Sequence, residues 1–256
     1  MVSNQKRTQL FQGLKSKINQ LKINPSRIHL KQYILEAAQS LEPASYVLDA
    51  GSGDSPHRNL FTHVNYESAD FGKAEGIAYR DITYICDLAS IPVSDCRYDL
   101  ILCTQVLEHV PSPAAVLREL FRVLKPGKEL WISAPLFYPE HLIPFDFFRY
   151  TQYGLSYLLK ESGFEIKRLE WLEGYYGTLS FELEFASKTL PLMPDSYGGG
   201  ITGILYTLLA VTLKPLFYFL SLIYERLDLH HKNTQIGHCK NYLVVAVKPH
   251  SPPMKT

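Results

Sequence analysis

The sequence predicts an α/β fold, a doubly wound three-layer sandwich built on a Rossmann-like, mostly parallel sheet. Three observations lead to this prediction. Short apolar strands alternate with helical stretches from residue 46 onward, several strands are apolar without interruption, and 46% of the 256 residues are hydrophobic. Uninterrupted apolar strands are typical of a parallel sheet covered by helices on both faces. The length suits one such domain with an added segment, and the composition excludes secreted, disulfide-rich and collagenous proteins.

Seven segments have the composition of strands, and two helices are bounded by clear signals. The first helix follows Ser112, an expected N-cap, and is expected to stop at Pro126-Gly127. The second covers 152–162 and ends at Gly163, which suits a left-handed cap. The predicted strands are Tyr46–Ala50, Val64–Ala69, Ile82–Cys86, Asp99–Cys103, Leu130–Ala134, Phe164–Trp171 and Tyr242–Val247.

Residues 1–42 are predicted to form an N-terminal helical arm, with a break at Asn24-Pro25 and a new N-cap at Ser26. Residues 1–35 carry seven Lys and Arg and no Asp or Glu, which leaves 19 basic and 25 acidic residues for the rest of the chain. A basic arm on an acidic body is typical of a solvated amphipathic helix, and it also suits an anionic contact such as phospholipid headgroups.

Residues 175–240 form an apolar helical insertion before the last strand. Ile201–Tyr224 is almost unbroken apolar sequence with Lys214-Pro215 in its middle, long enough for one membrane-spanning helix. If the strands on either side share a sheet, one crossing would separate them, and two crossings need about 40 residues. We therefore expect a kinked helical pair that returns to the same side. It would lie at a membrane surface, cover the active site, form a dimer contact or pack in the core.

A glycine-rich turn follows the first predicted strand in the run VLDAGSG, residues 47–53. Gly51 and Gly53 let the backbone approach a ligand closely and adopt positive φ. Asp49, at the end of the strand, can accept hydrogen bonds from an amino group or its water. The dinucleotide-binding fingerprint needs a third glycine where Pro56 stands, which argues against a dinucleotide oxidoreductase.

Two further acids follow the next two strands. Asp70 ends the second strand, at a spacing that suits a contact to both hydroxyls of a ribose. Asp87 follows the third strand, where a carboxylate can accept a hydrogen bond from an adenine amino group. Each acid alone is more often a turn or cap residue, but their order and spacing together predict a nucleoside pocket.

With these motifs the chain resembles the class I S-adenosylmethionine-dependent methyltransferases of the small-molecule group. The resemblance covers residues 46–171, with 242–247 similar to the family's final antiparallel strand, and rests on VLDAGSG, SADF, CDLASIP, YDLILCTQVLEHV and LKPGKELWISAP. It implies a methyltransferase domain over 43–174 and 241–250 and S-adenosylmethionine as the cofactor. The cofactor-binding residues that it implies are Asp49, Gly51, Gly53, Asp70, Asp87, Leu88 and Gln105.

The loop after the fifth strand, residues 136–150, is where the family builds its acceptor pocket. His141 is the expected general base, oriented by Asp146 or Glu140, because the ordinary pKa of histidine is close to neutral. The structural alternative for His141 is that it caps the loop or packs on Phe145. The expected acceptor-binding residues are Tyr138, Arg149 and Tyr150, and no metal site is expected because no metal-ligand spacing appears.

These patterns predict a transferase that methylates a small-molecule or lipid-like acceptor, with O-methylation favoured. A catalytically inactive methyltransferase-like scaffold is the first alternative, and a nucleotide-dependent oxidoreductase is the second. We expect a cytoplasmic protein that contacts the membrane peripherally through 201–224 and the basic arm; a homodimer through the same segment is the alternative. Nucleic acid is not an expected partner, because the basic residues lie in the arm and not around the pocket.

Overall fold

The structure, a computed structural model, describes residues 22–73, 76, 79 and 81–250. Within these residues one mixed sheet has the strand order β3-β2-β1-β4-β5-β7-β6. This arrangement confirms the predicted fold class. The strands are β1 (Tyr46–Ala50), β2 (Asn65–Asp70), β3 (Tyr84–Ile85), β4 (Tyr98–Thr104), β5 (Leu124–Pro135), β6 (Glu165–Trp171) and β7 (Asn241–Val247).

The pairing of the strands is parallel from β3 to β5 and antiparallel on both sides of β7. In the last two ladders, Pro135 pairs with Asn241 and Trp171 pairs with Tyr242. The last strand is therefore antiparallel to its neighbours, as the resemblance implied. Chain order reverses between β1 and β4, and a ligand of an open α/β sheet binds outside the carboxyl ends of the strands at such a point.

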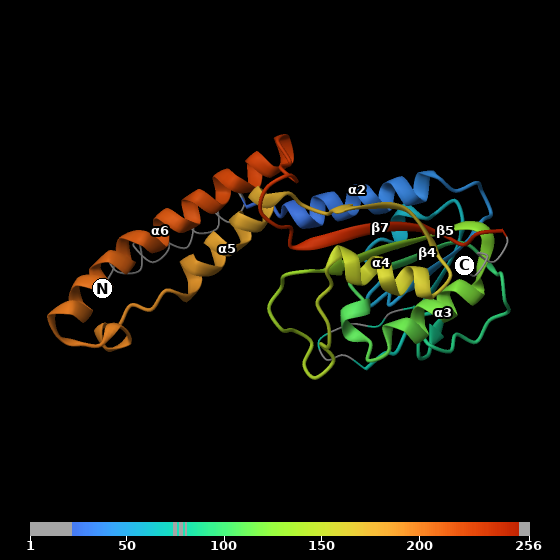
Figure 1. Ribbon diagram of the computed structural model, residues 1–256, viewed down its shortest axis with the longest axis horizontal. Helices are drawn as coiled ribbons and strands as arrows, with labels where there is room; N and C mark the ends of the chain where they lie inside the picture. Colours follow the sequence, from blue (N-terminus) through green and yellow to red (C-terminus); the bar gives the residue numbers. More distant parts are fainter. Residues whose placement is uncertain (1–21, 74–75, 77–78, 80, 251–256) are drawn as a thin grey trace, which may run out of the picture. The chain divides into compact units, whose positions relative to one another are not determined.

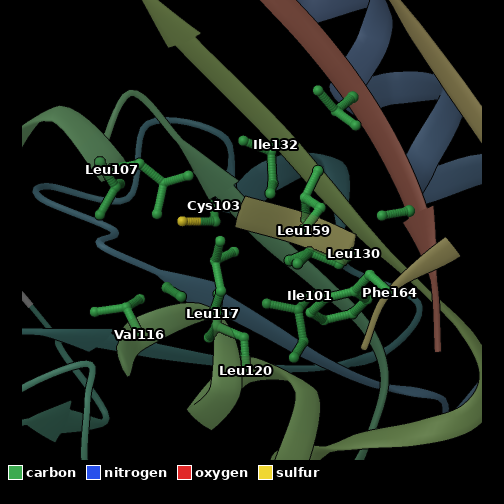
Figure 2. Packing of buried hydrophobic residues seen from close by; sticks show 14 of the residues in the cluster. Ile101, Cys103, Leu107, Val116, Leu117, Leu120, Leu130, Ile132, Leu159 and Phe164 are labelled. Carbon is green, nitrogen blue, oxygen red and sulfur yellow. The ribbon is translucent and has the colours of Figure 1, made fainter. Parts of the chain in front are cut away.

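Helices cover both faces of the sheet (Figure 1). On one face α3 (Pro113–Val123) and α4 (Gln152–Glu161) supply Leu117, Leu120 and Leu159, which pack against alternate residues of the central strands. Figure 2 shows this core around Ile101 and Cys103. The other face is packed by α2 (Pro25–Gln39), with the buried residues Tyr33, Ile34, Ala37 and Ala38. The alternation along β4 divides its side chains between the two cores.

Helix termini differ from the sequence prediction at two places and agree at a third. α2 begins at Pro25, and its cap is Asn24, whose Oδ1 accepts a hydrogen bond from the Arg27 amide at 3.2 Å; the expected cap at Ser26 is wrong. α3 ends at Val123, before Pro126-Gly127, because Leu124 already pairs with β4. Gly163 has φ of +92° and caps α4 as predicted.

The insertion before the last strand is a hairpin of two helices, α5 (Tyr175–Thr189) and α6 (Gly200–His230). A short 3-10 turn, η3 (Pro194–Tyr197), lies between them. The expected break within 201–224 is wrong: Pro215 stands inside one continuous helix, and the chain reverses at 190–199 instead. We call residues 175–230 the apolar hairpin. By length and composition α6 alone would suffice to cross a membrane, and little of its apolar stretch is buried.

The described chain divides into two compact units. One contains residues 22–28 and 173–238, and the other contains 29–172 and 239–250 with the gaps noted above. The apolar hairpin therefore belongs to the first unit, and the sheet with its helices forms the second. The predicted helix over residues 5–21 and most of the basic arm lie outside the described residues.

Candidate active site

A cavity of about 720 Å³ opens at the carboxyl ends of β1, β2, β3 and β4, at the switch point of the sheet. We call it the strand-end cavity. Six of the seven residues predicted to bind a cofactor line it, and together they end or follow the four strands β1 to β4, whose carboxyl ends lie at one edge of the sheet. They are Gly51, Gly53, Asp70, Asp87, Leu88 and Gln105.

The glycine turn after β1 is held tightly in place. Gly51 has φ of +80°, and a Cβ atom there would lie 2.3 Å from a methyl carbon of Val106, so no side chain fits at this position. The amide of Gly53 donates to Asp70 Oδ2 at 2.9 Å, and the amide of Gly72 donates to Asp70 Oδ1 at 3.0 Å. Each carboxylate oxygen retains accepting capacity, because it has a second lone pair.

The far end of the cavity is formed after β3. Asp87 Oδ1 accepts the Ala89 amide at 2.8 Å, which fixes the turn that carries Leu88 into the wall. After β4, Gln105 has φ of +56°, and its amide nitrogen donates to Ser133 Oγ at 3.1 Å. The cavity thus combines two acidic positions with apolar walls, which suits a polar nucleoside.

Asp49 is set apart from the other predicted cofactor residues. It is missing from the described residues that line the strand-end cavity, and it is 5% exposed below the glycine turn. The hydroxyl of Tyr66 donates a hydrogen bond to its Oδ2. Burial raises the pKa of Asp49 to about 6, and the negative charge of Asp70 adds to this rise. A direct contact of Asp49 with the cofactor stays a prediction.

Arg149 holds the loop of residues 136–150 together. Its guanidinium donates to both carboxylate oxygens of Asp146 at 2.7 and 2.8 Å, and to the carbonyl oxygens of Tyr138, Pro139 and Phe148. The guanidinium holds the pKa of Asp146 well below its usual range. With so many partners inside the loop, Arg149 serves as its structural clamp, and a role in acceptor binding stays a prediction.

The other predicted acceptor residues lie around this clamp rather than in the cavity wall. Tyr150 is buried, and its hydroxyl donates to the Leu107 carbonyl at 2.7 Å. Tyr138 stands with its ring edge-on to the ring of His141, with centroids 5.1 Å apart. The backbone amide of His141 donates to Asp146 Oδ2 at 2.8 Å, and its Nδ1 lies 3.3 Å from the same oxygen. A role of His141 as the general base stays a prediction.

Three side chains meet where η2 (Leu107–His109), a 3-10 turn after β4, approaches the loop: Glu108, His109 and His141, which we call the imidazole cluster. One ligating atom from each lies within 4.8 Å of the others, and the two imidazole rings are 4.6 Å apart. Glu108 is fully buried, and neither of its carboxylate oxygens has a hydrogen-bond partner. Burial raises the pKa of Glu108 to about 8. Within this cluster, His109 also lines the strand-end cavity.

Several wall residues escaped sequence reasoning because their segments carry no motif. The loop supplies Leu142, Phe145 and Phe147, and α3 supplies Ala115 and Val116. The aromatic content of 136–150 was a usable signal for the loop. For Glu108 the only signal was a carboxylate in the otherwise apolar run VLEHV.

The sheet order, the glycine turn and the two acids at successive strand ends define the class of this domain. The chain carries a class I S-adenosylmethionine-dependent methyltransferase domain, and the cofactor of this class is S-adenosylmethionine. The family model described as "Methyltransferase domain" matches residues 48–132, which include every predicted cofactor residue.

Comparison with known proteins supports this class. The chain is 32% identical over 124 residues to a ubiquinone biosynthesis O-methyltransferase of Proteus mirabilis, with 44% of this chain and 49% of that one covered. It is 29% identical over 134 residues to a probable S-adenosylmethionine-dependent methyltransferase of Mycolicibacterium smegmatis, with 47% and 52% covered. The chain thus spans about half the length of these curated relatives.

Two solved structures share the fold at low sequence identity. The crystal structure of the [4+2]-cyclase SpnF has a TM-score of 0.52 and 18% identity, with 88% of this chain and 81% of that one covered. A phosphoethanolamine N-methyltransferase of Haemonchus contortus, in complex with phosphomonomethylethanolamine and S-adenosylhomocysteine, has a TM-score of 0.51 and 14% identity, with 86% and 53% covered. At these identities the likeness establishes the fold alone.

Proposed function

We propose that the protein transfers the methyl group of S-adenosylmethionine to an oxygen of an amphiphilic small molecule at a membrane surface. The observation that carries methyl transfer is the strand-end cavity, where the glycine turn, Asp70 and Asp87 occupy three successive strand ends. The fold by itself does not define the reaction, since one protein of this fold is a [4+2]-cyclase. The positions of Asp70 and Asp87 at successive strand ends are the feature that favours binding of a sulfonium nucleoside.

In this proposal, different residues of the cavity bind different parts of the cofactor. Gly51 and Gly53 would admit the methionine end, and at Gly51 no Cβ atom occupies the space beside Val106. Asp70 would accept hydrogen bonds from the ribose hydroxyls, and Asp87 would accept one from the adenine amino group beside Leu88. Gln105, fixed by Ser133, would face the methyl group. These contacts position the donor, which is the main contribution an enzyme makes to this displacement.

In the transfer step, a lone pair of the acceptor oxygen forms the new bond to the methyl carbon. The carbon–sulfur bond breaks, and its electron pair stays on sulfur, which leaves neutral S-adenosylhomocysteine. A hydroxyl acceptor must also lose its proton, and a group near the oxygen has to make that loss easier. The imidazole cluster borders the cavity through His109. His141, the predicted base, belongs to the same cluster.

O-methylation of a lipid-like molecule is the form of the reaction that we favour. The matched relative from Proteus mirabilis is a ubiquinone biosynthesis O-methyltransferase, which supports an oxygen acceptor. The aromatic side chains that line the cavity from the loop, Phe145 and Phe147, offer an apolar wall for such a molecule. A second, independent argument for an acceptor taken from a lipid phase comes from the exposed apolar side chains of the apolar hairpin.

The apolar hairpin changes in polarity along its length. At its base, buried carboxylates are bonded within the unit: Glu225 accepts the amide of Ile23 at 2.8 Å, and Asp228 accepts the amide of Gly174 at 3.2 Å. Its tip, residues 190–213, contains one charged residue, Asp195. Large apolar side chains of the tip are exposed at Leu192, Met193, Ile201, Ile204, Leu205, Tyr206, Leu208, Leu209 and Val211.

These tip residues favour lipid over a protein partner. On α6 they spread over more than half of the helix circumference, whereas a helix that packs on one partner needs a single apolar stripe. Lys214, the next charge along α6, is turned inward, and its ammonium donates to the carbonyl oxygens of Lys188 and Leu190. The tip therefore offers almost no charge to a polar partner, and single monomers rarely expose such a surface.

The hairpin is expected to enter one leaflet without crossing the bilayer. α5 has 15 residues and is about 22 Å long, which is shorter than the hydrocarbon core of about 30 Å. The chain must also return to β7, which pairs with β6 on the near side of the insertion. A peripheral attachment agrees with both facts, and the basic residues of the N-terminal arm would add an attraction to anionic lipid.

The function is tested first by calorimetric titration of the purified chain with S-adenosylmethionine and S-adenosylhomocysteine, with NADH as the control. We expect binding of the sulfur nucleosides alone. Asp70→Ala should weaken that binding at least tenfold, or about 1.4 kcal/mol, whereas His141→Ala should leave it unchanged. No binding to the folded protein would refute methyl transfer and favour the inactive scaffold.

Membrane attachment is tested separately by flotation with phosphatidylcholine vesicles, with and without anionic lipid. The double variant Leu205→Glu/Leu208→Glu should lose binding to both vesicle types, while Tyr153→Glu, which changes an exposed ring of α4, should keep it. Removal of residues 1–21 should reduce only the salt-sensitive part of binding. If the double variant instead dissolves a dimer and leaves vesicle binding unchanged, the hairpin is a dimer contact and the membrane proposal fails.

A further inference from the structure

Among the described residues of the sheet unit, Glu108 of the imidazole cluster has two buried side-chain oxygens without a hydrogen-bond partner. The residue is fully enclosed. A buried carboxylate without partners is costly, and burial of such a group is normally compensated by a cation or by hydrogen bonds. Two histidines are the neighbours of Glu108, and imidazole is a common metal ligand. A metal ion is therefore the cation that suits this position.

The two histidines are held in the orientation that metal-binding imidazoles adopt. His109 Nδ1 lies 2.6 Å from the Phe145 carbonyl oxygen, and His141 Nδ1 lies 3.2 Å from the Pro139 carbonyl oxygen and 3.3 Å from Asp146. A metal-bound histidine usually donates one ring N–H to a carbonyl or carboxylate and presents the other nitrogen to the metal. Here both Nδ1 atoms are so engaged, which leaves Nε2 of each ring as the ligand atom.

The spacing of the cluster fits an ion after small side-chain rotations. His109 Nε2 is 3.8 Å from Glu108 Oε1, and one ligating atom from each residue lies within 4.8 Å of the others. Ligands of a tetrahedral zinc ion at about 2.1 Å are separated by about 3.4 Å. The loop carrying His141 can close this difference more easily than η2 can, since the His141 side chain is a third exposed whereas Glu108 is fully buried.

We propose that Glu108, His109 and His141 form a site for a divalent transition-metal ion of the zinc type, on the acceptor side of the strand-end cavity. Two imidazoles and one carboxylate leave a coordination position open. Because His109 lines the cavity, that position faces the space where an acceptor oxygen would lie. This role rests on the proposed methyl transfer: a bound ion would make the hydroxyl proton easier to lose. His141 then acts as a ligand.

The test is direct metal binding by the full chain, which does not depend on turnover. The protein is stripped with a chelator and dialysed against Zn²⁺, and bound metal is measured by mass spectrometry. We expect one ion per chain, with affinity reduced at least tenfold in Glu108→Gln, which preserves side-chain volume, and in His141→Asn. Co²⁺ in place of Zn²⁺ should give the visible absorption of a nitrogen- and oxygen-bound ion, and Glu108→Gln should change it.

Two controls separate this site from other zinc ligands. His250→Asn replaces an exposed histidine beside Gly127, at the opposite end of β5, and Cys96→Ser removes an exposed thiol. Neither change should alter the stoichiometry. Absence of binding in the folded protein, or binding that survives both Glu108→Gln and His141→Asn, overturns the proposal. If Glu108→Gln does not fold, the loop variant His141→Asn decides alone.

The outcome is independent of the cofactor assignment. Titration of the same metal-free protein with S-adenosylhomocysteine shows whether the nucleoside site exists. Nucleoside binding without metal binding would refute the metal site alone, and metal binding without nucleoside binding would refute the proposed function alone.

Discussion

The hydroxyl of Tyr66 donates a hydrogen bond to Asp49 across the neighbouring strands β1 and β2, beneath the glycine turn. Asp49 thereby gains a hydrogen-bond donor although it is only 5% exposed, and its pKa is about 6 because burial disfavours the charged form. The pair supports the floor of the site, and its charge destabilises the fold at neutral pH. This relationship leads to the first prediction.

Asp49→Asn should stabilise the protein at neutral pH and not at pH 4. The carboxyl has a higher pKa in the folded state than in the unfolded state, so the native state binds more protons between pH 4 and 6 and stability falls as pH rises through that window. The variant lacks this loss, and its advantage should grow to at most about 3 kcal/mol above pH 6. Urea unfolding at pH 4, 5, 6 and 7 measures it; an advantage independent of pH would contradict the assignment.

Gly51→Ala should damage both stability and nucleoside binding. The new Cβ atom would meet Val106 at 2.3 Å in a left-handed conformation, and the strain should cost about 2–4 kcal/mol. Gly198→Ala is the matched control, since Gly198 has φ of +88° with open space around it and should cost about 1 kcal/mol. Val106→Ala in the Gly51→Ala background should restore part of the loss; no recovery would mean that the steric explanation is wrong.

Arg149→Met should loosen the loop of residues 136–150. The change leaves Asp146, whose side chain is 3% exposed, without its guanidinium partner, and should destabilise the protein by roughly 1–3 kcal/mol. Limited proteolysis within the loop should accelerate, with nucleoside affinity preserved. Arg122→Met, which removes another bonded arginine away from the loop, serves as the comparison. If Arg149→Met leaves proteolysis unaltered and raises only the KM of the acceptor, Arg149 binds the acceptor as predicted.

Lys214→Met should open the apolar hairpin near its tip. The ammonium of Lys214 donates to the carbonyl oxygens of Lys188 and Leu190, the last acceptors at the end of α5. Without it these groups lose their partner, and protease cleavage in 189–199 should become several-fold faster. Lys160→Met, at the exposed end of α4, should have no such effect. An equal acceleration in both variants would indicate a loss of charge and not of a cap.

The sheet and most of the cavity could be predicted because each depends on local sequence. Apolar runs fixed the strands, and the strand ends placed Gly51, Asp70 and Asp87 together once the sheet was parallel. Side-chain positions that depend on long-range contacts could not be predicted from the sequence. Asp49 has the sequence position of a cofactor residue, but Tyr66, 17 residues away, holds it below the turn.

The start of α2, the continuity of α6 and the imidazole cluster could not be predicted from the sequence either. Ser26 and Asn24 are both good caps by composition, and only the geometry at Arg27 selects Asn24. Pro215 is expected to break a helix, yet α6 continues through it. His141 joins Glu108 and His109 through a loop fold held by Arg149, so no spacing along the chain revealed the three together.

The chain leaves the sheet unit and returns to it at almost the same point. The Leu172 amide donates to the Asn241 carbonyl at 2.9 Å, next to the pairing of Trp171 with Tyr242. Such an arrangement makes the hairpin a module: a short turn of a few residues in place of 173–238 would reconnect β6 to β7 as an ordinary antiparallel connection. The sheet unit and the hairpin can therefore be separated by protein engineering, and the hairpin can be grafted into the matching turn of another methyltransferase domain.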